Sequence, residues 1–306
     1  MNLTAIKQTN LYGLEKNFDE FVRLYDDKKL PNKILLSGQK GTGKSTLCYH
    51  LINYILSKDE DYSYDLKNYT IHNDNRSFKL ILNNINPNFF LVDINPDKKF
   101  IEINQIRTLI ENLNKSSFNQ KPKFILIDNI EFLNLNSINA LLKSLEEPGE
   151  NIYFFLIQNN KKTLDTLKSR CLNYKINLTH QQVIEISNRL MNTDIYDFIN
   201  NDLLNYYITP GKIYDLINFS IDNKVDLKSL KLESFLNLII DNSYYKKESC
   251  IKYMIFDFVE LLLKKKFSTN NHSLFSYFLK KIENTYKFNL DEESLFLEFK
   301  AKVING

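Results

Sequence analysis

Short apolar runs alternate with amphipathic stretches between residues 33 and 177, and this alternation constrains the fold more than any other feature. Four runs have the length and apolar content of buried strands: 34–36, 89–92, 124–127 and 152–157. Stretches with helical spacing of their apolar residues follow the first three runs, at 45–56, 103–113 and 137–145. Apolar strands that are each followed by a helix are typical of a parallel sheet covered on both faces. We therefore predict an α/β domain here.

The rest of the chain is predicted to be helical. Few glycines and prolines occur (7 and 6 in 306 residues), which disfavours the frequent turns of an all-β chain. Helical spacing recurs over 181–200, 212–219, 229–240, 250–265, 273–286 and 292–303, with a break at Thr209-Pro210-Gly211. The predicted fold class is α/β plus all-α, in three domains at 1–178, 179–224 and 225–306. The polar segment 57–84 is expected to be irregular.

Charge, cysteine content and hydropathy narrow the functional classes. The formal net charge of +3 is compatible with nucleic acid nearby but does not require it. Cys48, Cys171 and Cys250 are far apart and odd in number, so they predict neither a disulfide framework nor a zinc site. The segment 1–7 has no apolar core, and no apolar run reaches about 18 residues. We therefore expect a cytoplasmic protein with no membrane partner.

A glycine-rich loop after the first strand carries the strongest chemical signal. Three of the seven glycines fall within six residues, in a G-x-x-x-x-G-K-[ST] motif before the helix expected at 45–56. Glycines let backbone N–H groups turn toward an anion, and the helix N-terminus adds positive charge. The motif predicts that Lys44 reaches the β- and γ-phosphates of ATP and that Ser45 contacts Mg²⁺; the alternative is a simple strand–helix turn. The candidate nucleotide-binding residues are Gly38, Gln39, Lys40, Gly41, Thr42, Gly43, Lys44, Ser45 and Thr46.

An acidic residue at the end of a neighbouring strand is the second part of such a site. Asp128 directly follows the run 124–127, so it is the candidate ligand to the metal's water shell; the alternative is a turn or cap aspartate. The next residue is Asn129, whose amide cannot act as a base. Glu131 is expected to face elsewhere. The sequence therefore predicts nucleotide binding more strongly than hydrolysis.

One arginine stands out because the chain contains so few. Only five arginines occur among the 40 basic residues, and Arg170 lies beyond the last predicted strand in Ser169-Arg170-Cys171. A planar guanidinium that is always charged is favoured where phosphate is recognised. In multi-subunit NTPases such an arginine can stabilise the phosphoryl group being transferred in a neighbouring subunit. The alternative is an ordinary surface ion pair.

A longer motif points to a family. Residues 139–148 read N-A-L-L-K-S-L-E-E-P, followed by a strand and the S-R-C segment. Weaker matches are Leu11-Tyr12-Gly13, Asn86-Pro87-Asn88-Phe89 and the helix that begins at Ile103. Together, over about residues 5–220, these segments resemble the AAA+ subunits of bacterial DNA polymerase III clamp loaders. The resemblance implies a P-loop sheet domain, a small helical lid (179–224) and a helical collar that closes a ring (225–306).

The resemblance also implies a type of subunit. The ATP-hydrolysing gamma/tau members usually carry four zinc-binding cysteines after the first helix and Asp-Glu after the metal strand. Segment 57–84 contains no cysteine, and Asn129 follows Asp128. The chain is therefore more similar to delta-prime members, which implies a ring with delta and three gamma/tau copies that loads the sliding clamp onto primed DNA.

Particular residues acquire expected roles from the same resemblance. Arg170 would act in trans on ATP bound to the adjacent subunit. Lys212 falls at the sensor 2 position near the nucleotide, and sensor 1 falls near Gln158 or Asn159. Two alternatives stay open: a gamma/tau-like or other AAA+ ATPase that acts on its own, and a small-molecule P-loop kinase.

Overall fold

The computed structural model describes residues 4–95, 98, 100–113, 120–147, 149–159, 165–204, 208–267, 272–288 and 290–305. The chain divides into two compact units, Met1–Leu178 and Thr179–Gly306. The further division of the second unit at residue 224 stays a prediction.

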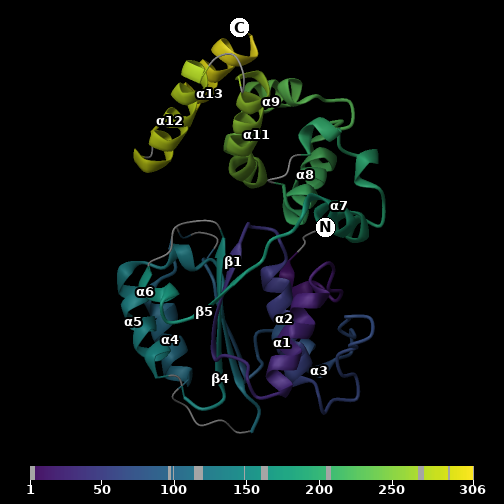
Figure 1. Cartoon of the computed structure of the whole chain (residues 1–306), viewed down its shortest axis with the longest axis vertical. Coiled ribbons are helices and arrows are strands. Elements are labelled where there is room, and N and C mark those ends of the chain that lie inside the picture. The colour runs from purple at the N-terminus through teal and green to yellow at the C-terminus, as the bar shows by residue number, and fades with distance from the viewer. Residues whose placement is uncertain are drawn as a thin grey trace. The chain divides into compact units, whose positions relative to one another are not determined.

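A five-stranded sheet lies at the centre of the first unit (Figure 1). The strand order is β2-β3-β4-β1-β5, and every neighbouring pair is parallel. The four predicted strands and three predicted helices agree with the structure to within two residues at each end. The elements of this unit are η1 (Ala5–Lys7), α1 (Glu15–Asp26), β1 (Lys33–Gly38), α2 (Lys44–Leu56), α3 (Arg76–Leu82), β2 (Phe89–Val92), α4 (Ile103–Leu113), β3 (Lys123–Ile127), η2 (Ile130–Phe132), α5 (Leu135–Glu146), β4 (Ile152–Asn159), α6 (Asp165–Lys168) and β5 (Leu172–Lys175).

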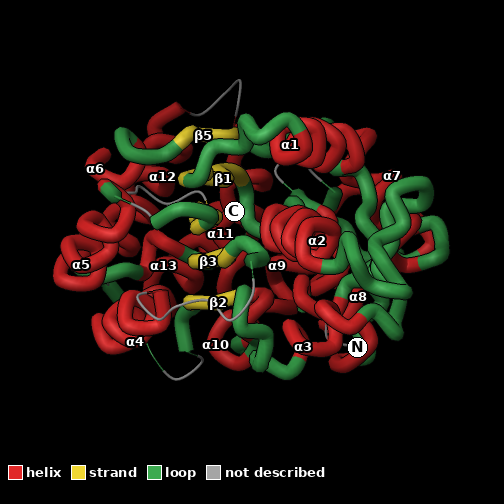
Figure 2. The backbone as a smooth tube through the Cα atoms, turned by 90° about the horizontal axis from the view of Figure 1, so that it is seen from below, coloured by secondary structure: helices red, strands yellow, loops and turns green. Residues whose placement is uncertain are grey.

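Helices cover both faces of the sheet, and the alternation of side chains along the strands explains this. In β3, Phe124 and Leu126 pack in one apolar cluster with α1, α2 and α3, whereas Ile125 and Ile127 pack in another with α4 and α5. Successive side chains of a strand point to opposite faces, so a strand that is apolar throughout supplies two cores. Figures 1 and 2 show the two helical layers on either side of the strands.

Helix α1 and strand β5 are among the elements of the first unit that the sequence does not predict. Helix α1 buries Phe18 and Phe21 in the apolar cluster that also contains α2 and one face of the sheet. Strand β5 pairs with β1 at the edge of the sheet, and its Leu172 is 47% exposed. An edge strand with exposed side chains has no continuous apolar run, so β5 gives no strand signal of the buried type.

The prediction that residues 57–84 are irregular is wrong in part. This segment contains α3, and it buries Tyr64, Ile71 and Phe78 in the cluster around α2. The side chain of Asn75 caps α3 by accepting the backbone N–H of Phe78 at 2.7 Å. The segment is therefore a covering layer for α2, and its asparagines and aspartates stabilise turns and a helix end.

Buried His50 connects α2 to two neighbouring segments. Its Nδ1 lies 2.8 Å from the hydroxyl of Tyr64, and its Nε2 lies 3.2 Å from the carbonyl oxygen of Gln8. A neutral ring with its proton on Nε2 satisfies both contacts, donating to Gln8 and accepting from Tyr64. Burial lowers the pKa of His50 from 6.5 to about 4, because the imidazolium would lose its hydration in the core.

Acidification from pH 7 to pH 4.5 is expected to remove about 2–3 kcal/mol of unfolding free energy through His50 alone. The unfolded chain binds a proton below about pH 6.5, whereas the folded chain resists protonation until about pH 4. Stability therefore falls as the pH drops through this window. Urea unfolding of wild type and His50→Gln at both pH values measures the difference, with the exposed His180→Gln as the control. Equal losses in wild type and His50→Gln would contradict the assignment.

Every regular element that the structure describes in the second unit is a helix. Predicted helix 181–200 ends early, at Met191, because Asn192 adopts a left-handed conformation with φ 52°. The Thr209-Pro210-Gly211 break is the start of α8, with Thr209 as N-cap. The elements are α7 (His180–Met191), η3 (Ile195–Asp197), η4 (Asn201–Leu203), α8 (Pro210–Asn223), α9 (Leu232–Asp241), α10 (Tyr244–Lys247), α11 (Ser249–Phe267), α12 (His272–Phe288), α13 (Glu292–Phe299) and a π-helical turn, η5 (Lys300–Ile304).

The predicted fold class, α/β plus all-α, is confirmed. Within the described ranges, no helix combines the length and apolar content that crossing a membrane requires.

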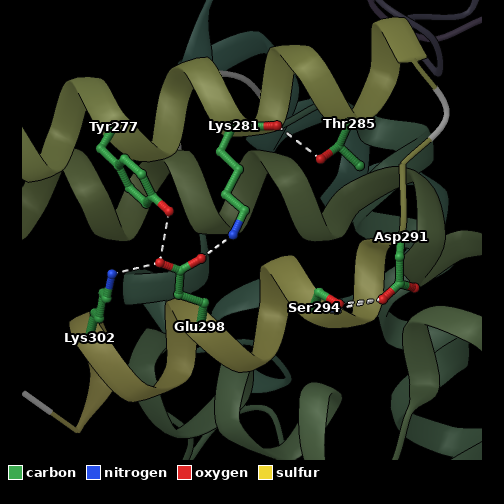
Figure 3. A network of polar contacts seen from close by, with 7 residues as sticks. All are labelled: Tyr277, Lys281, Thr285, Asp291, Ser294, Glu298 and Lys302. Atoms are coloured by element: carbon green, nitrogen blue, oxygen red, sulfur yellow. Dashed lines mark hydrogen bonds and ion pairs between the residues drawn. The ribbon is translucent and has the colours of Figure 1, made fainter.

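A polar network joins the last two helices (Figure 3). The Glu298 carboxylate of α13 accepts hydrogen bonds from the Tyr277 hydroxyl at 2.8 Å and from the Lys302 ammonium at 2.6 Å, and it also accepts one from Lys281. These donors hold the pKa of Glu298 at about 2, Lys281 contributing most. Because Tyr277 and Lys281 lie on α12, the network fixes α13 against its neighbour.

Candidate nucleotide-binding site

The glycine-rich loop connects β1 to α2, and its three glycines have positive φ values that residues with a side chain rarely adopt. Gly41 and Gly43 have φ values of 84° and 88°, which are strained for residues with a Cβ. A Cβ on Gly38 would lie 2.4 Å from the carbonyl oxygen of Ile176. Gly43 is the N-cap of α2 and has no side chain to bond the first N–H groups of that helix, which leaves them for an anion.

The side chain of Lys44 lies over this loop. Its ammonium donates to the carbonyl oxygens of Gly38 at 3.0 Å and Gln39 at 2.6 Å, and it lies 3.4 Å from the hydroxyl of Thr42. Lys44 is only 3% exposed, and this burial lowers its pKa to about 8. The loop therefore holds a largely buried cation paired with carbonyl dipoles, an arrangement that a phosphate would stabilise further.

Ser45 and Asp128 meet beside the loop, as the sequence predicts for a Mg²⁺ site. The Ser45 hydroxyl donates to the Asp128 carboxylate at 2.6 Å. Burial raises the pKa of Asp128 despite this hydrogen bond, and the charge of nearby Asp93 adds to the effect. A hydroxyl and a carboxylate are oxygen ligands of the type that Mg²⁺ prefers, and a bound cation would relieve the cost of burying the carboxylate.

Asn129 connects the ends of three strands. It has a left-handed conformation, with φ 55°. Its amide nitrogen donates to Asp93, after β2, at 2.7 Å, and its amide oxygen accepts from Asn159, at the end of β4, at 3.0 Å. Asn129 therefore serves as a structural bridge near the end of β3. An amide has no proton-accepting nitrogen, so this bridge cannot activate water as a base.

The prediction that Glu131 faces elsewhere is wrong. Its carboxylate accepts the backbone N–H of Asn159 at 3.3 Å, and its charge opposes the burial-induced fall in the pKa of Lys44. Sequence reasoning missed Asp93 and Glu131 as parts of the site. Asp93 directly follows an apolar strand, as Asp128 does, and that shared position is a signal that could have identified it.

Arg170 and Lys212, which the sequence also predicts as site residues, form ion pairs. The Arg170 guanidinium contacts Glu146, the last residue of α5, with Nη2 2.7 Å from the carboxylate. In the second unit, the Lys212 ammonium lies 2.5 Å from the carboxylate of Asp257 on α11. The structure thus brings Lys44, Ser45 and Asp128 together and gives Arg170 and Lys212 partners of their own. Pro148 of the L-E-E-P motif lies outside the described residues.

A sequence model described as "DNA polymerase III, delta subunit" matches residues 13–180, more than half of the chain. The chain belongs to the DNA polymerase III delta subunit family. The matched region contains the glycine-rich loop, Asp128 and Arg170. The similarity to delta-prime members predicted from the sequence is confirmed by this match and by the relatives below.

Similar proteins include delta-prime and gamma subunits. The DNA polymerase III subunit delta' of Buchnera aphidicola subsp. Schizaphis graminum is 28% identical over 287 residues, which span 89% of this chain and 84% of that protein. The gamma subunit of the same organism is 28% identical over 57% of this chain, and the match spans 43% of its own length. The delta' subunit of Escherichia coli is 25% identical, over 52% of this chain and 46% of that protein.

Among solved structures, a gamma subunit-related protein of Thermotoga maritima has a TM-score of 0.45 and 17% identity, with 95% of this chain and 97% of that one covered.

Proposed function

We propose that this chain is a delta-prime subunit of the DNA polymerase III clamp loader. The observation that carries this proposal is the match with a delta' subunit over most of both chains, which includes the helical second unit. As such a subunit it joins gamma/tau and delta subunits in a cytoplasmic hetero-oligomer that loads the sliding clamp onto primed DNA. Residues 179–224 serve as the lid, and residues 225–306 serve as the collar through which the ring closes.

We propose further that the loop binds ATP with Mg²⁺. The positive φ values of Gly41 and Gly43, the buried Lys44 and the contact between Ser45 and Asp128 support this. Lys44 and the first N–H groups of α2 would hold the phosphates, and Ser45 and Asp128 would hold the Mg²⁺, which neutralises phosphate charge when bound. The chain retains rather than hydrolyses the nucleotide, because Asn129 replaces the usual glutamate and its side chain is engaged at both ends.

In this proposal, Arg170 is the residue of this chain that takes part in ATP hydrolysis. Its guanidinium acts on ATP bound by the adjacent gamma subunit and stabilises charge on the transferring phosphoryl group. The scarcity of arginine in the chain and the position of Arg170 after the L-E-E-P motif support this role. The sensor 2 role of Lys212 is proposed with it and requires that Lys212 release Asp257 when nucleotide binds.

Reconstitution tests complex membership. The chain is mixed with purified gamma and delta subunits of its own organism, and size-exclusion chromatography and clamp loading on primed DNA are measured. Co-elution and loading that depend on this chain are expected. A chain that stays monomeric beside assembled gamma and delta would contradict the proposal.

A variant complex isolates the site served by Arg170. In it, the corresponding S-R-C arginine of every gamma copy is replaced by alanine, so that this chain contributes the one remaining arginine. We call this assembly the one-arginine complex. Its ATP turnover reports on the gamma site adjacent to this chain.

Replacing Lys44 with alanine is expected to weaken MgATP binding by the isolated chain about 100-fold. The ammonium makes charge-assisted contacts to phosphate, and their loss costs about 2.7 kcal/mol. Calorimetric titration of wild type and Lys44→Ala measures the effect, with the exposed Lys16→Ala on α1 as the charge-matched control. Equal affinity for MgATP in wild type and Lys44→Ala would contradict the proposed nucleotide site, and the proposed membership of the complex would be unaffected.

A gamma-like ATPase is the second candidate, favoured by the similarity to a gamma subunit over 57% of this chain. The two candidates differ in intrinsic turnover. The isolated delta-prime-like chain is expected to show no ATP hydrolysis that Lys44→Ala abolishes. Sustained hydrolysis that disappears in that variant would favour the gamma-like function.

A further inference from the structure

The side chain of Arg170 is held by hydrogen bonds from this chain. Nε and Nη2 both donate to one carboxylate oxygen of Glu146, at 3.2 Å and 2.7 Å. Nη1 donates to the backbone carbonyl of Thr166 at 3.1 Å. The guanidinium plane is therefore fixed by two acceptors, one a side chain of α5 and the other the backbone of α6.

Part of the guanidinium stays available in this arrangement. An arginine has five N–H donors, and the two acceptors engage three of them. One N–H on each of Nη1 and Nη2 is without an acceptor among the residues that the structure describes. The Arg170 side chain is 33% exposed. A guanidinium with two such N–H groups can still bind phosphate oxygens.

The backbone of Glu146 is held in place by the packing of α5 against the sheet. Glu146 is the last residue of α5, and the residue before it, Leu145, is fully buried in the cluster that α5 shares with the sheet. A negative charge at this end of a helix is unfavourable, because the helix C-terminus carries partial negative charge. An exposed ion pair also adds little stability. Glu146 therefore contributes little to folding, and its clear effect is on the orientation of Arg170.

We propose that Glu146 is a positioning residue that holds Arg170 ready for the phosphates of the adjacent subunit. This inference rests on the proposed function of Arg170. An unrestrained arginine loses side-chain freedom when it engages phosphate, and the bonds to Glu146 and Thr166 restrict that freedom before the subunits meet. The carboxylate remains bonded to Nε and Nη2 while the outer N–H groups contact phosphate.

Three substitutions in the one-arginine complex test the proposal. Glu146→Ala is expected to lower kcat for ATP about tenfold with KM unchanged, because the arginine is misplaced while ATP binding by gamma is intact. Glu146→Gln should keep most of the wild-type kcat, because its amide oxygen can still accept from Nε and Nη2. Glu147→Ala, an exposed neighbouring carboxylate, is the matched control and should retain wild-type kcat. Urea unfolding of each isolated variant checks that the fold is unchanged.

Comparison with Arg170→Ala separates this inference from the proposed function. Adding Glu146→Ala to Arg170→Ala should cause no further loss, because both substitutions remove one interaction. If Arg170→Ala lowers kcat and Glu146→Ala does not, or if Glu146→Ala raises kcat, the positioning role is wrong and the proposed function stands. A further loss in the double variant also contradicts the positioning role. If Arg170→Ala has no effect, both are wrong.

Discussion

The Arg170→Ala substitution is expected to lower ATP turnover by the one-arginine complex about 10³-fold. A guanidinium that contacts the transferring phosphoryl group stabilises charge that develops only in the transition state. Its loss should therefore reduce kcat and leave assembly of the complex and the KM for ATP unchanged. Arg170→Lys should also reduce kcat by more than about tenfold, because a single ammonium cannot replace the planar array of N–H donors.

The control for this prediction is Arg107→Ala, which removes an exposed arginine from α4 of the same unit. That variant should match wild type in assembly and turnover. MgATP binding by the isolated Arg170→Ala chain should equal that of wild type as well, because Arg170 pairs with Glu146 rather than with the loop. Wild-type turnover in the Arg170→Ala complex would refute the trans role and leave the ion pair with Glu146 as the whole explanation of this residue.

The Gly38→Ala substitution is expected to destabilise the chain by about 2–4 kcal/mol. The new methyl group would lie 2.4 Å from the carbonyl oxygen of Ile176, and the backbone at Gly38 has φ 150°, where residues with a side chain are strained. The obstructing atom belongs to the backbone, so no side-chain rotation relieves the contact. Strands β1 and β5 must separate locally, which also displaces the start of the glycine-rich loop.

Urea unfolding at pH 7 measures this loss, and Gly149→Ala is the matched control. A methyl group on Gly149 would lie 3.0 Å from the end of the Ile152 side chain, which can rotate away. The control should therefore change the unfolding free energy by less than about 1 kcal/mol. A Gly38→Ala variant as stable as wild type would mean that β5 is free to move away from β1.

The sequence predicted the parts of the fold that depend on continuous apolar segments. The strands β3 and β4 are predicted from continuous apolar runs, and helices α4 and α5 from apolar residues at helical spacing. Strand β5 was missed because its Leu172 is exposed at an edge. Segment 57–84 has no helical or strand pattern in the sequence because its buried Tyr64 and Ile71 are spaced among polar residues without a period.

The sequence likewise predicts some residues of the candidate site and not others. Lys44, Ser45 and Asp128 were predicted because a local motif and a strand end specify them, and the structure brings them together. The bridge formed by Asn129 between Asp93 and Asn159 was not predicted. It depends on the order of β2, β3 and β4 in the sheet, which single-strand patterns do not contain. The turn of Glu131 toward the site likewise depends on the 3₁₀ helix η2, which has no periodic signal.

Lys44 makes hydrogen bonds within its own loop, so the loop can form without a ligand. Its ammonium already has oxygen partners in Gly38 and Gln39, so the charge of Lys44 is compensated within the loop while the chain folds. Phosphate bound at the proposed site would have to displace these partners, and the free energy of that exchange would be subtracted from its affinity. Under the proposed function, a newly made chain can therefore fold before it binds ATP or joins its partner subunits.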